Sequence, residues 1–279
     1  MLIATAAFFA VVNMMGPLAD TPRATNDVEA VSPRLELAAS ASPPTTASTG
    51  ATPTAPASTN PDPALDAVVN TLQKTYEGTK DFKGRFTQKF TFTMLRRTQE
   101  STGSVSFEKP GRMRWDYDTP APKSFIVDGK ALWIVQPQDK VAFVNACFQQ
   151  DGLTASVAFL WGEGKLREQF SISWFDGTFG DKSDHHLLLV PRDGNSVFAR
   201  LILVVDPKTS RVKQSVVVDL AGNVNQFIFR ELAFNVGKAG GITAATFGYK
   251  PSPGIHAQRL PGSCEAPVAG LSTKDAAAR

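Results

Sequence analysis

Residues 104–117 read SVSFEKPGRMRWDY. On each side of the central Lys-Pro-Gly, large apolar residues alternate with small, polar or charged residues. Successive side chains of a β-strand point to opposite faces of the sheet, so this period of two predicts strands with one apolar face and one face in water. The apolar positions are Val105, Phe107, Met113, Trp115 and Tyr117.

The same pattern continues outward from this stretch. Upstream, Phe86, Gln88, Phe90 and Phe92 alternate with Thr87, Lys89, Thr91 and Thr93. Downstream, an apolar run at 125–127 leads into Asp128-Gly129, a strong tight-turn pair, and then into a second apolar run at 132–135, which predicts a hairpin. Further strands are expected at 187–190, 198–205, 212–220, 225–234 and 245–249.

Helical patterns are rarer. Asp62 can cap a helix and Pro63 suits its first turn, after which apolar residues recur at helical spacing until Gly78. Residues 155–166 contain a second, short apolar pattern. Consecutive short strands joined by tight turns indicate an antiparallel sheet rather than βαβ units. We therefore expect a mainly β fold of about ten or eleven strands, covered by two or three helices.

Composition restricts the function. The 279 residues are 42% hydrophobic and 20% charged, which excludes wholesale disorder. The net charge is only +3 and the basic residues are scattered, which argues against nucleic acid as the main partner. The chain has 19 Phe but only 3 Tyr. Because buried Phe needs no hydrogen-bond partner, this ratio predicts an interior that is apolar throughout.

The segments outside the predicted fold have their own character. An apolar run at 2–12 has the length of a secretory signal core and is too short to span a bilayer, although a buried helix is the alternative. We expect an export signal over approximately 1–24, a disordered Ala/Ser/Thr/Pro-rich spacer over 25–61, the folded domain over 62–262 and a flexible tail over 263–279.

The sequence offers little catalytic chemistry. His185 and His186 are adjacent on an expected strand, so they point to opposite faces and cannot share a metal ion. Asp116, Asp118 and Asp128 could supply a carboxylate pair for glycoside hydrolysis, but a wet strand face, a strand end and a hairpin tip explain them better. We expect no enzyme activity, no cofactor and no metal site.

Cys147 and Cys264 are the only cysteines. In an oxidising compartment two such thiols tend to pair, and a bridge would attach the C-terminal tail to the domain. Two unpaired thiols are the alternative.

A family resemblance adds to this interpretation. The stretch from Phe107 to Tyr117, followed by Pro120 and by Val-Asp-Gly-Lys-Ala-Leu-Trp at 127–133, resembles the most diagnostic segment of the LolA family, the periplasmic carriers of outer-membrane lipoproteins. Residues 81–88 resemble the opening strand of that family. The resemblance covers about residues 64–260 and includes, near its end, Phe247, Pro251, Pro253, Gly254 and Ile255.

The resemblance implies an incomplete, half-open antiparallel β-barrel that helices close over an apolar cavity. An acyl chain of about 16 carbons costs on the order of 12 kcal/mol to leave in water, so an apolar cavity could shield it. Each candidate residue has an alternative role as ordinary core. The candidates for the cavity wall are Phe86, Phe90, Met113, Trp115, Phe125 and Trp133, and those for a helical lid are Phe159, Leu160 and Trp161.

Lys109 departs from the family pattern, and the loop with Arg96 and Arg97 can be compared with a loop of the family. Lys109, before Pro110, stands where the family typically has an arginine that holds the lid, and a lysine supplies a point charge instead of a planar fork. Arg96 and Arg97 occupy the loop between the first strands, which is either a partner-facing edge or a solvated turn.

The resemblance implies a monomeric, non-enzymatic periplasmic carrier. It would receive acylated lipoproteins from an inner-membrane ABC transporter and pass them to an outer-membrane acceptor, without contact to nucleic acid. A related cavity protein for another lipid or glycolipid is one alternative. A regulatory domain that senses lipoproteins is another.

Overall fold

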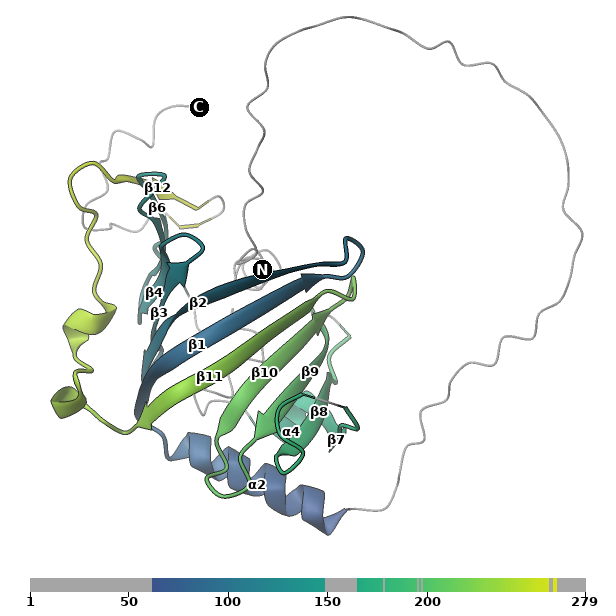
Figure 1. The fold of residues 1–279 in the computed structure, drawn as a ribbon. Helices are drawn as coiled ribbons and strands as arrows, with labels where there is room; N and C mark the ends of the chain where they lie inside the picture. The colour runs from purple at the N-terminus through teal and green to yellow at the C-terminus, as the bar shows by residue number, and fades with distance from the viewer. Residues whose placement is uncertain are drawn as a thin grey trace, which may run out of the picture. The chain divides into compact units, whose positions relative to one another are not determined.

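The computed structural model describes residues 62–148, 165–177, 179–194, 196, 198–260 and 263–264. They form one twelve-stranded sheet with the strand order β12-β6-β5-β4-β3-β2-β1-β11-β10-β9-β8-β7 (Figure 1). The strands are β1 (Asp81–Phe92), β2 (Arg97–Glu108), β3 (Arg112–Thr119), β4 (Lys123–Asp128), β5 (Leu132–Gln136), β6 (Val141–Asn145), β7 (Phe170–Trp174), β8 (His185–Pro191), β9 (Phe198–Val205), β10 (Val212–Asp219), β11 (Val224–Phe234) and β12 (His256–Arg259).

The sheet is open, and all its strand pairs are antiparallel except β12 with β6, which is parallel. The expected half-open, mainly β fold is therefore confirmed. The strand count is higher than predicted because three short strands of four or five residues were overlooked: β6 and β12 lack a clear alternation, whereas β7 alternates but is brief. The strand expected at 245–249 is wrong. The 3-10 helix η4 (Ala244–Phe247) stands there, and the side chains of Thr243 and Thr246 cap its start.

The predicted N-terminal helix is confirmed as α2 (Pro63–Glu77). It buries Val69, Leu72 and Tyr76, which share an apolar cluster with β7 to β10. The Tyr76 hydroxyl accepts a hydrogen bond from the Val212 amide at 3.1 Å, which satisfies a polar group inside this cluster. Burial raises the pKa of Tyr76 well above its usual value. Of the helices described, none is both long and apolar enough to cross a membrane.

Two apolar clusters lie on the same face of the sheet. The first is built by β1 to β5 and β11, and the second by α2, α4 (Leu166–Gln169) and β7 to β10. Phe229 and Phe234 pack against both, and the ring of Tyr76 meets that of Phe234 edge-on at 6.4 Å. We call this shared apolar side the inner face. Its helix α2 lies across the β7–β11 half (Figure 1).

The C-terminal segment packs on the opposite, outer face. After the short 3-10 helix η3 (Lys238–Gly240) and η4, Tyr249, Ile255 and Ala257 cover a third cluster on β4, β5 and β6. A disulfide then joins Cys147, just beyond β6, to Cys264, with their Cα atoms 5.8 Å apart. Because 117 residues separate the two cysteines, this bridge restricts the unfolded chain and adds up to about 4 kcal/mol in the chain-entropy view.

Candidate functional site

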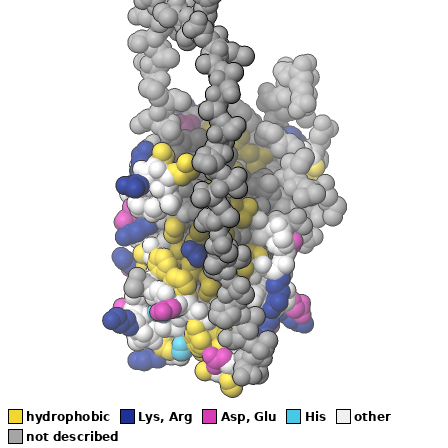
Figure 2. All heavy atoms as spheres, turned by 90° about the vertical axis from the view of Figure 1, so that its right-hand side faces the viewer, with side chains coloured by type: hydrophobic (Ala, Val, Ile, Leu, Met, Phe, Trp, Pro, Cys, Tyr) yellow, Lys and Arg dark blue, Asp and Glu magenta, His cyan; other side chains and the backbone are white. Residues whose placement is uncertain are grey.

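The first apolar cluster is the candidate site, and we call it the aromatic floor. All its buried members come from strands, whereas the second cluster also takes residues from α2. The floor residues are buried, and the surface on the side of β7 shows other hydrophobic side chains among Lys, Arg, Asp and Glu (Figure 2). The floor consists of Phe82, Phe86, Val105, Phe107, Met113, Tyr117, Phe125, Val127, Leu132 and Phe227, with Trp115 and Phe229 partly buried against it.

Phe86 makes ring contacts with three other aromatic residues of the floor. Its ring meets those of Trp115 and Tyr117 edge-on, at 4.9 Å in each case, and that of Phe227 at 5.9 Å. Edge-on contacts match the positive ring edge to the negative ring face, so the rings hold one another without hydrogen bonds. Ring contacts of this kind do not depend on a directional partner.

A glycine makes room for the Phe86 ring. Gly103 on β2 lies opposite both Phe86 on β1 and Tyr117 on β3. A Cβ atom at position 103 would lie 2.7 Å from Cζ of Phe86 and 2.1 Å from the carbonyl oxygen of Asp116. Only glycine therefore lets the Phe86 ring lie over β2.

The structure brings most of the predicted wall residues together. Phe86, Met113 and Phe125 are buried members of the floor, and Trp115 packs against them. Trp133 does not belong to this wall, so that prediction is wrong. Trp133 pairs with Ile126 across β4 and β5, and its ring lies 5.0 Å from that of Tyr249 on the outer face. The run 132–135 is apolar on both sides, so its alternation could not assign a face.

Phe90 is buried on the inner face but lies outside the floor. Between it and Phe86 stands Gln88, whose Nε2 donates a 2.8 Å hydrogen bond to Oδ1 of Asn225. Beyond this buried polar pair, the rings of Phe90 and Phe92 approach to 4.6 Å. Aromatic side chains thus continue from the floor toward the β1–β2 turn.

The predicted lid residues Phe159, Leu160 and Trp161 lie outside the described residues. The lid therefore stays a prediction.

Lys109 is bonded to α2. Its Nζ donates hydrogen bonds to the carbonyl oxygens of Tyr76 at 2.8 Å and Glu77 at 3.0 Å. The last carbonyls of a helix lack partners within the helix and carry partial negative charge, so an ammonium group suits them. Lys109 thus attaches the β2–β3 turn to the C-terminal end of α2, beside the exposed Pro110.

Lys123 is a residue that the sequence analysis missed. Its Nζ lies over the inner face, 4.6 Å from the ring centre of Tyr117 and 5.9 Å from that of Phe125. Burial lowers the pKa of Lys123 from 10.5 to about 8. The sequence could have indicated this position. Lys123, Phe125 and Val127 are two residues apart and therefore share one face of the strand, which places a cation on the apolar side.

The three aspartates considered for hydrolysis are each engaged separately. No cluster of three or more His, Cys, Asp or Glu side chains suited to a metal ion occurs among the residues described. Asp116 accepts hydrogen bonds from Arg114 and Ser124, Asp118 pairs with Arg85, and Asp128 accepts from the amides of Lys130 and Ala131.

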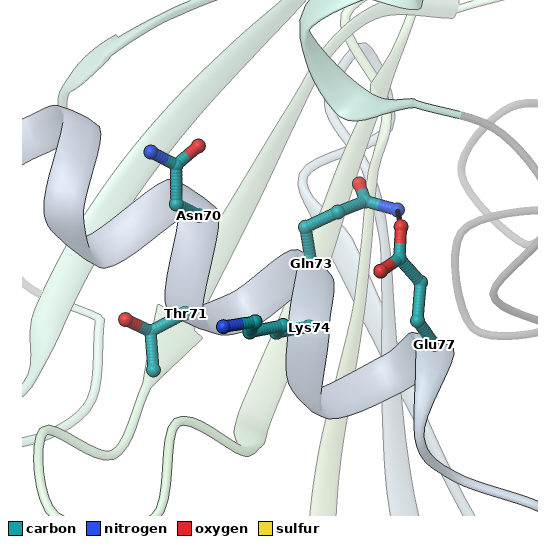
Figure 3. A pocket seen from close by; sticks show the side chains of 5 residues that line it. All are labelled: Asn70, Thr71, Gln73, Lys74 and Glu77. Carbon is teal, nitrogen blue, oxygen red and sulfur yellow. Dashed lines mark hydrogen bonds between the residues drawn. The ribbon is translucent and has the colours of Figure 1, made fainter.

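A hollow of about 220 Å³ lies along α2 (Figure 3). Within it, the Gln73 side chain donates to Glu77 at 3.0 Å and accepts from the Leu166 amide at 3.1 Å. This polar lining does not suit an acyl chain. Its residues are Asn70, Thr71, Gln73, Lys74 and Glu77.

An open, mainly antiparallel sheet with a largely apolar inner face and a helix across part of it is typical of proteins that cover apolar ligands. The sequence comparison identifies the family. Residues 77–240 match the model of the family described as outer membrane lipoprotein carrier protein LolA, and the chain belongs to this family.

Curated relatives agree. An outer-membrane lipoprotein carrier protein of Dechloromonas aromatica is 25% identical over 195 residues, which span 67% of this chain and 85% of the relative. One of Nitrosomonas europaea is 25% identical over 189 residues, or 68% of this chain and 87% of the relative.

Solved structures are more distant. An uncharacterized conserved protein from Thermus thermophilus aligns with a TM-score of 0.45 at 12% identity, covering 71% of this chain and 99% of that one. A LolA superfamily protein from Nitrosomonas europaea aligns with a TM-score of 0.35 at 10% identity, covering 66% and 97%.

Proposed function

We propose that this chain is a periplasmic carrier that shields the acyl chains of outer-membrane lipoproteins. It would receive them from an inner-membrane ABC transporter and deliver them to an outer-membrane acceptor. Family membership supports the class of cargo. The observation that carries the proposal is the aromatic floor, an apolar surface built from strand residues alone within the described chain.

The energetics of shielding favour such a surface. Each methylene removed from water contributes about 0.8 kcal/mol, so long acyl chains need a large apolar cover. Rings that make no hydrogen bonds to the chain impose no directional barrier to its release. A carrier needs both properties, because it has to surrender what it binds.

The periplasmic location rests on two features. The disulfide between Cys147 and Cys264 suits an oxidising compartment. Residues 1–24 have the character of an export signal, and 25–61 that of a spacer. We propose with this that the folded carrier domain begins at residue 62, after the export signal and the spacer.

A release assay tests the function. The purified protein is added to spheroplasts that produce a tagged triacylated lipoprotein, and the soluble fraction is examined for a complex. We expect a soluble complex that Trp115→Glu abolishes, because a carboxylate on the floor repels acyl chains. Val190→Glu places the same charge on an exposed position of β8 and should leave the complex intact.

Circular dichroism and thermal unfolding establish that both variants are folded. If the folded wild-type protein releases no lipoprotein, the proposal is wrong. Lipid extracted from the purified protein would then identify a different cargo.

A further inference from the structure

Two turns at one end of the sheet carry exposed apolar side chains at positions where turns normally place polar residues or glycine. Met94 and Leu95 occupy the corner of the β1–β2 turn and are 89% and 72% exposed. Leu220, in the β10–β11 turn, is 73% exposed. Gly, Pro, Asn, Asp and Ser dominate such positions for conformational reasons, and these three side chains contribute nothing to the core. We call the three residues the apolar tip.

The two turns form one unit and lie side by side (Figure 1). The Thr93 hydroxyl donates a 2.6 Å hydrogen bond to the Gly222 carbonyl, and the Thr93 amide donates to Oδ1 of Asn223 at 3.2 Å. Asp219 accepts hydrogen bonds from the amides of Ala221 and Asn223 at 2.9 and 2.8 Å, which fixes the second turn. Hydrogen bonds between the two turns and within the second turn therefore hold the tip in place.

The charge beside the tip is positive. Arg96 completes the β1–β2 turn and Arg97 begins β2, and both are exposed. Further along the same hairpin, Glu100 is paired with Lys89 at 3.6 Å. Basic side chains next to protruding aliphatic ones match an anionic membrane surface, where arginine meets phosphate and the aliphatic groups enter the interface.

We propose that the apolar tip and its two arginines contact the surface of an anionic lipid bilayer. Three side chains on a protruding double turn are too few for a stable protein interface, which takes about 800 Å² from each partner. They suit brief, shallow insertion between lipid headgroups. Phe92 and Phe90 lead from this turn along the inner face, so the contact places the apolar side of the carrier at the bilayer. The inference extends the proposed function and rests on it for its purpose.

A fluorescent label tests the contact in the full chain. Leu95→Cys carries an environment-sensitive nitrobenzoxadiazole at the tip. Lys208→Cys carries it in the exposed β9–β10 turn, at the other end of the sheet. With vesicles of phosphatidylglycerol and phosphatidylcholine in equal parts, we expect a blue shift at position 95 and none at 208. Vesicles of phosphatidylcholine alone should give a weaker shift, because the arginines then lack their partner.

Further substitutions measure the strength of the contact. Adding Met94→Asp and Leu220→Asp to the labelled Leu95→Cys chain should weaken vesicle binding about tenfold or more, since two aliphatic groups no longer enter the interface. Thermal unfolding should not change, because both residues are exposed.

Three results would overturn the inference. The label at 95 stays in water with both vesicle types, or the label at 208 responds as strongly. If the fluorescence of the label at 95 does not change with vesicles but shifts when a membrane protein is added, the tip contacts a protein partner, and the inference is overturned. Lipoprotein release is measured separately. If the protein releases lipoprotein but the label at 95 shows no shift, only the membrane contact is rejected.

Discussion

The two halves of the inner face are built from different side chains. The half under α2 is largely leucine and valine, which interdigitate with Val69 and Leu72 of the helix. The other half is largely phenylalanine, and the described part of the chain supplies its buried members from strands only. Aliphatic side chains of varied shape give close packing between two layers. In the aromatic half, flat rings meet edge-on, and its members are buried to the same degree as those under α2. The comparison therefore contrasts two apolar clusters of different composition, of which we propose the aromatic one as the site for acyl chains.

The largest expected effect tests this contrast directly. Leu72→Ala removes a fully buried side chain from α2 and should lower the free energy of unfolding by about 2–5 kcal/mol. Trp115→Ala, on the partly buried border of the floor, should cost clearly less stability but weaken lipoprotein release more. Urea unfolding and the release assay measure the two effects. Equal losses of stability would show that the aromatic half is an ordinary core.

The next prediction concerns how the floor is shaped. Gly103→Ala should lower the free energy of unfolding by about 1–3 kcal/mol, because the new methyl group collides with the Phe86 ring and the Asp116 carbonyl. Gly194→Ala is the matched control, since nothing lies within 4 Å of its Cβ position. Urea unfolding checks both. A neutral Gly103→Ala would mean that the rings rearrange freely.

A smaller effect is expected where the two halves are joined. Lys109→Met removes both hydrogen bonds to the end of α2 and should cost about 1–2 kcal/mol, whereas Lys109→Arg should retain most of the stability. Hydrogen exchange at the last turn of α2 should accelerate in Lys109→Met only. Lys130→Met, at an exposed hairpin, is the control. Unchanged exchange would show that Lys109 does not hold the helix.

The last prediction is a pH dependence in the aromatic half. The pKa of Lys123 is about 8 in the folded protein and 10.5 in its ordinary state, because burial disfavours the charged form. Between these values the unfolded chain binds more protons, so this group's contribution to stability rises with pH through that window. The stability of Lys123→Met relative to wild type should therefore fall as the pH increases from 7 to about 10. Unfolding curves at several pH values measure this, and a constant difference would contradict it.

Much of the fold could be predicted because its signals are local. The strands around Val105 and Trp115 alternate cleanly, and the helix after Asp62 has both start signals and one apolar stripe. The alternation at 245–249 did not mark a strand, because Ala245 and Phe247 lie in a 3-10 helix that packs against β3 and β4. Short strands such as β12 depend on pairing with a distant segment, for which the chain has no local signal.

The candidate site was predicted in part for the same reason. Phe86 and Met113 were found because polar neighbours mark the apolar face of their strands, whereas Phe125 belongs to an apolar run whose inward side the sequence did not settle. Trp133 was misplaced because β5 is apolar on both sides, and Phe227 was overlooked because it begins an apolar run, Phe227-Ile228-Phe229, which does not assign a face. The roles of Lys109 and Lys123 needed contacts across the sheet.

The amino-acid sequence alone determined the alternating strands, the first helix, the excess of phenylalanine and the family, since each depends on residues close together in the chain. The tertiary structure alone decided which face Trp133 occupies, that Lys109 attaches to α2, and that the Met94 and Leu220 turns meet. These features arise from contacts between segments far apart in the chain, and their energies depend on a geometry that exists only once the sheet has formed.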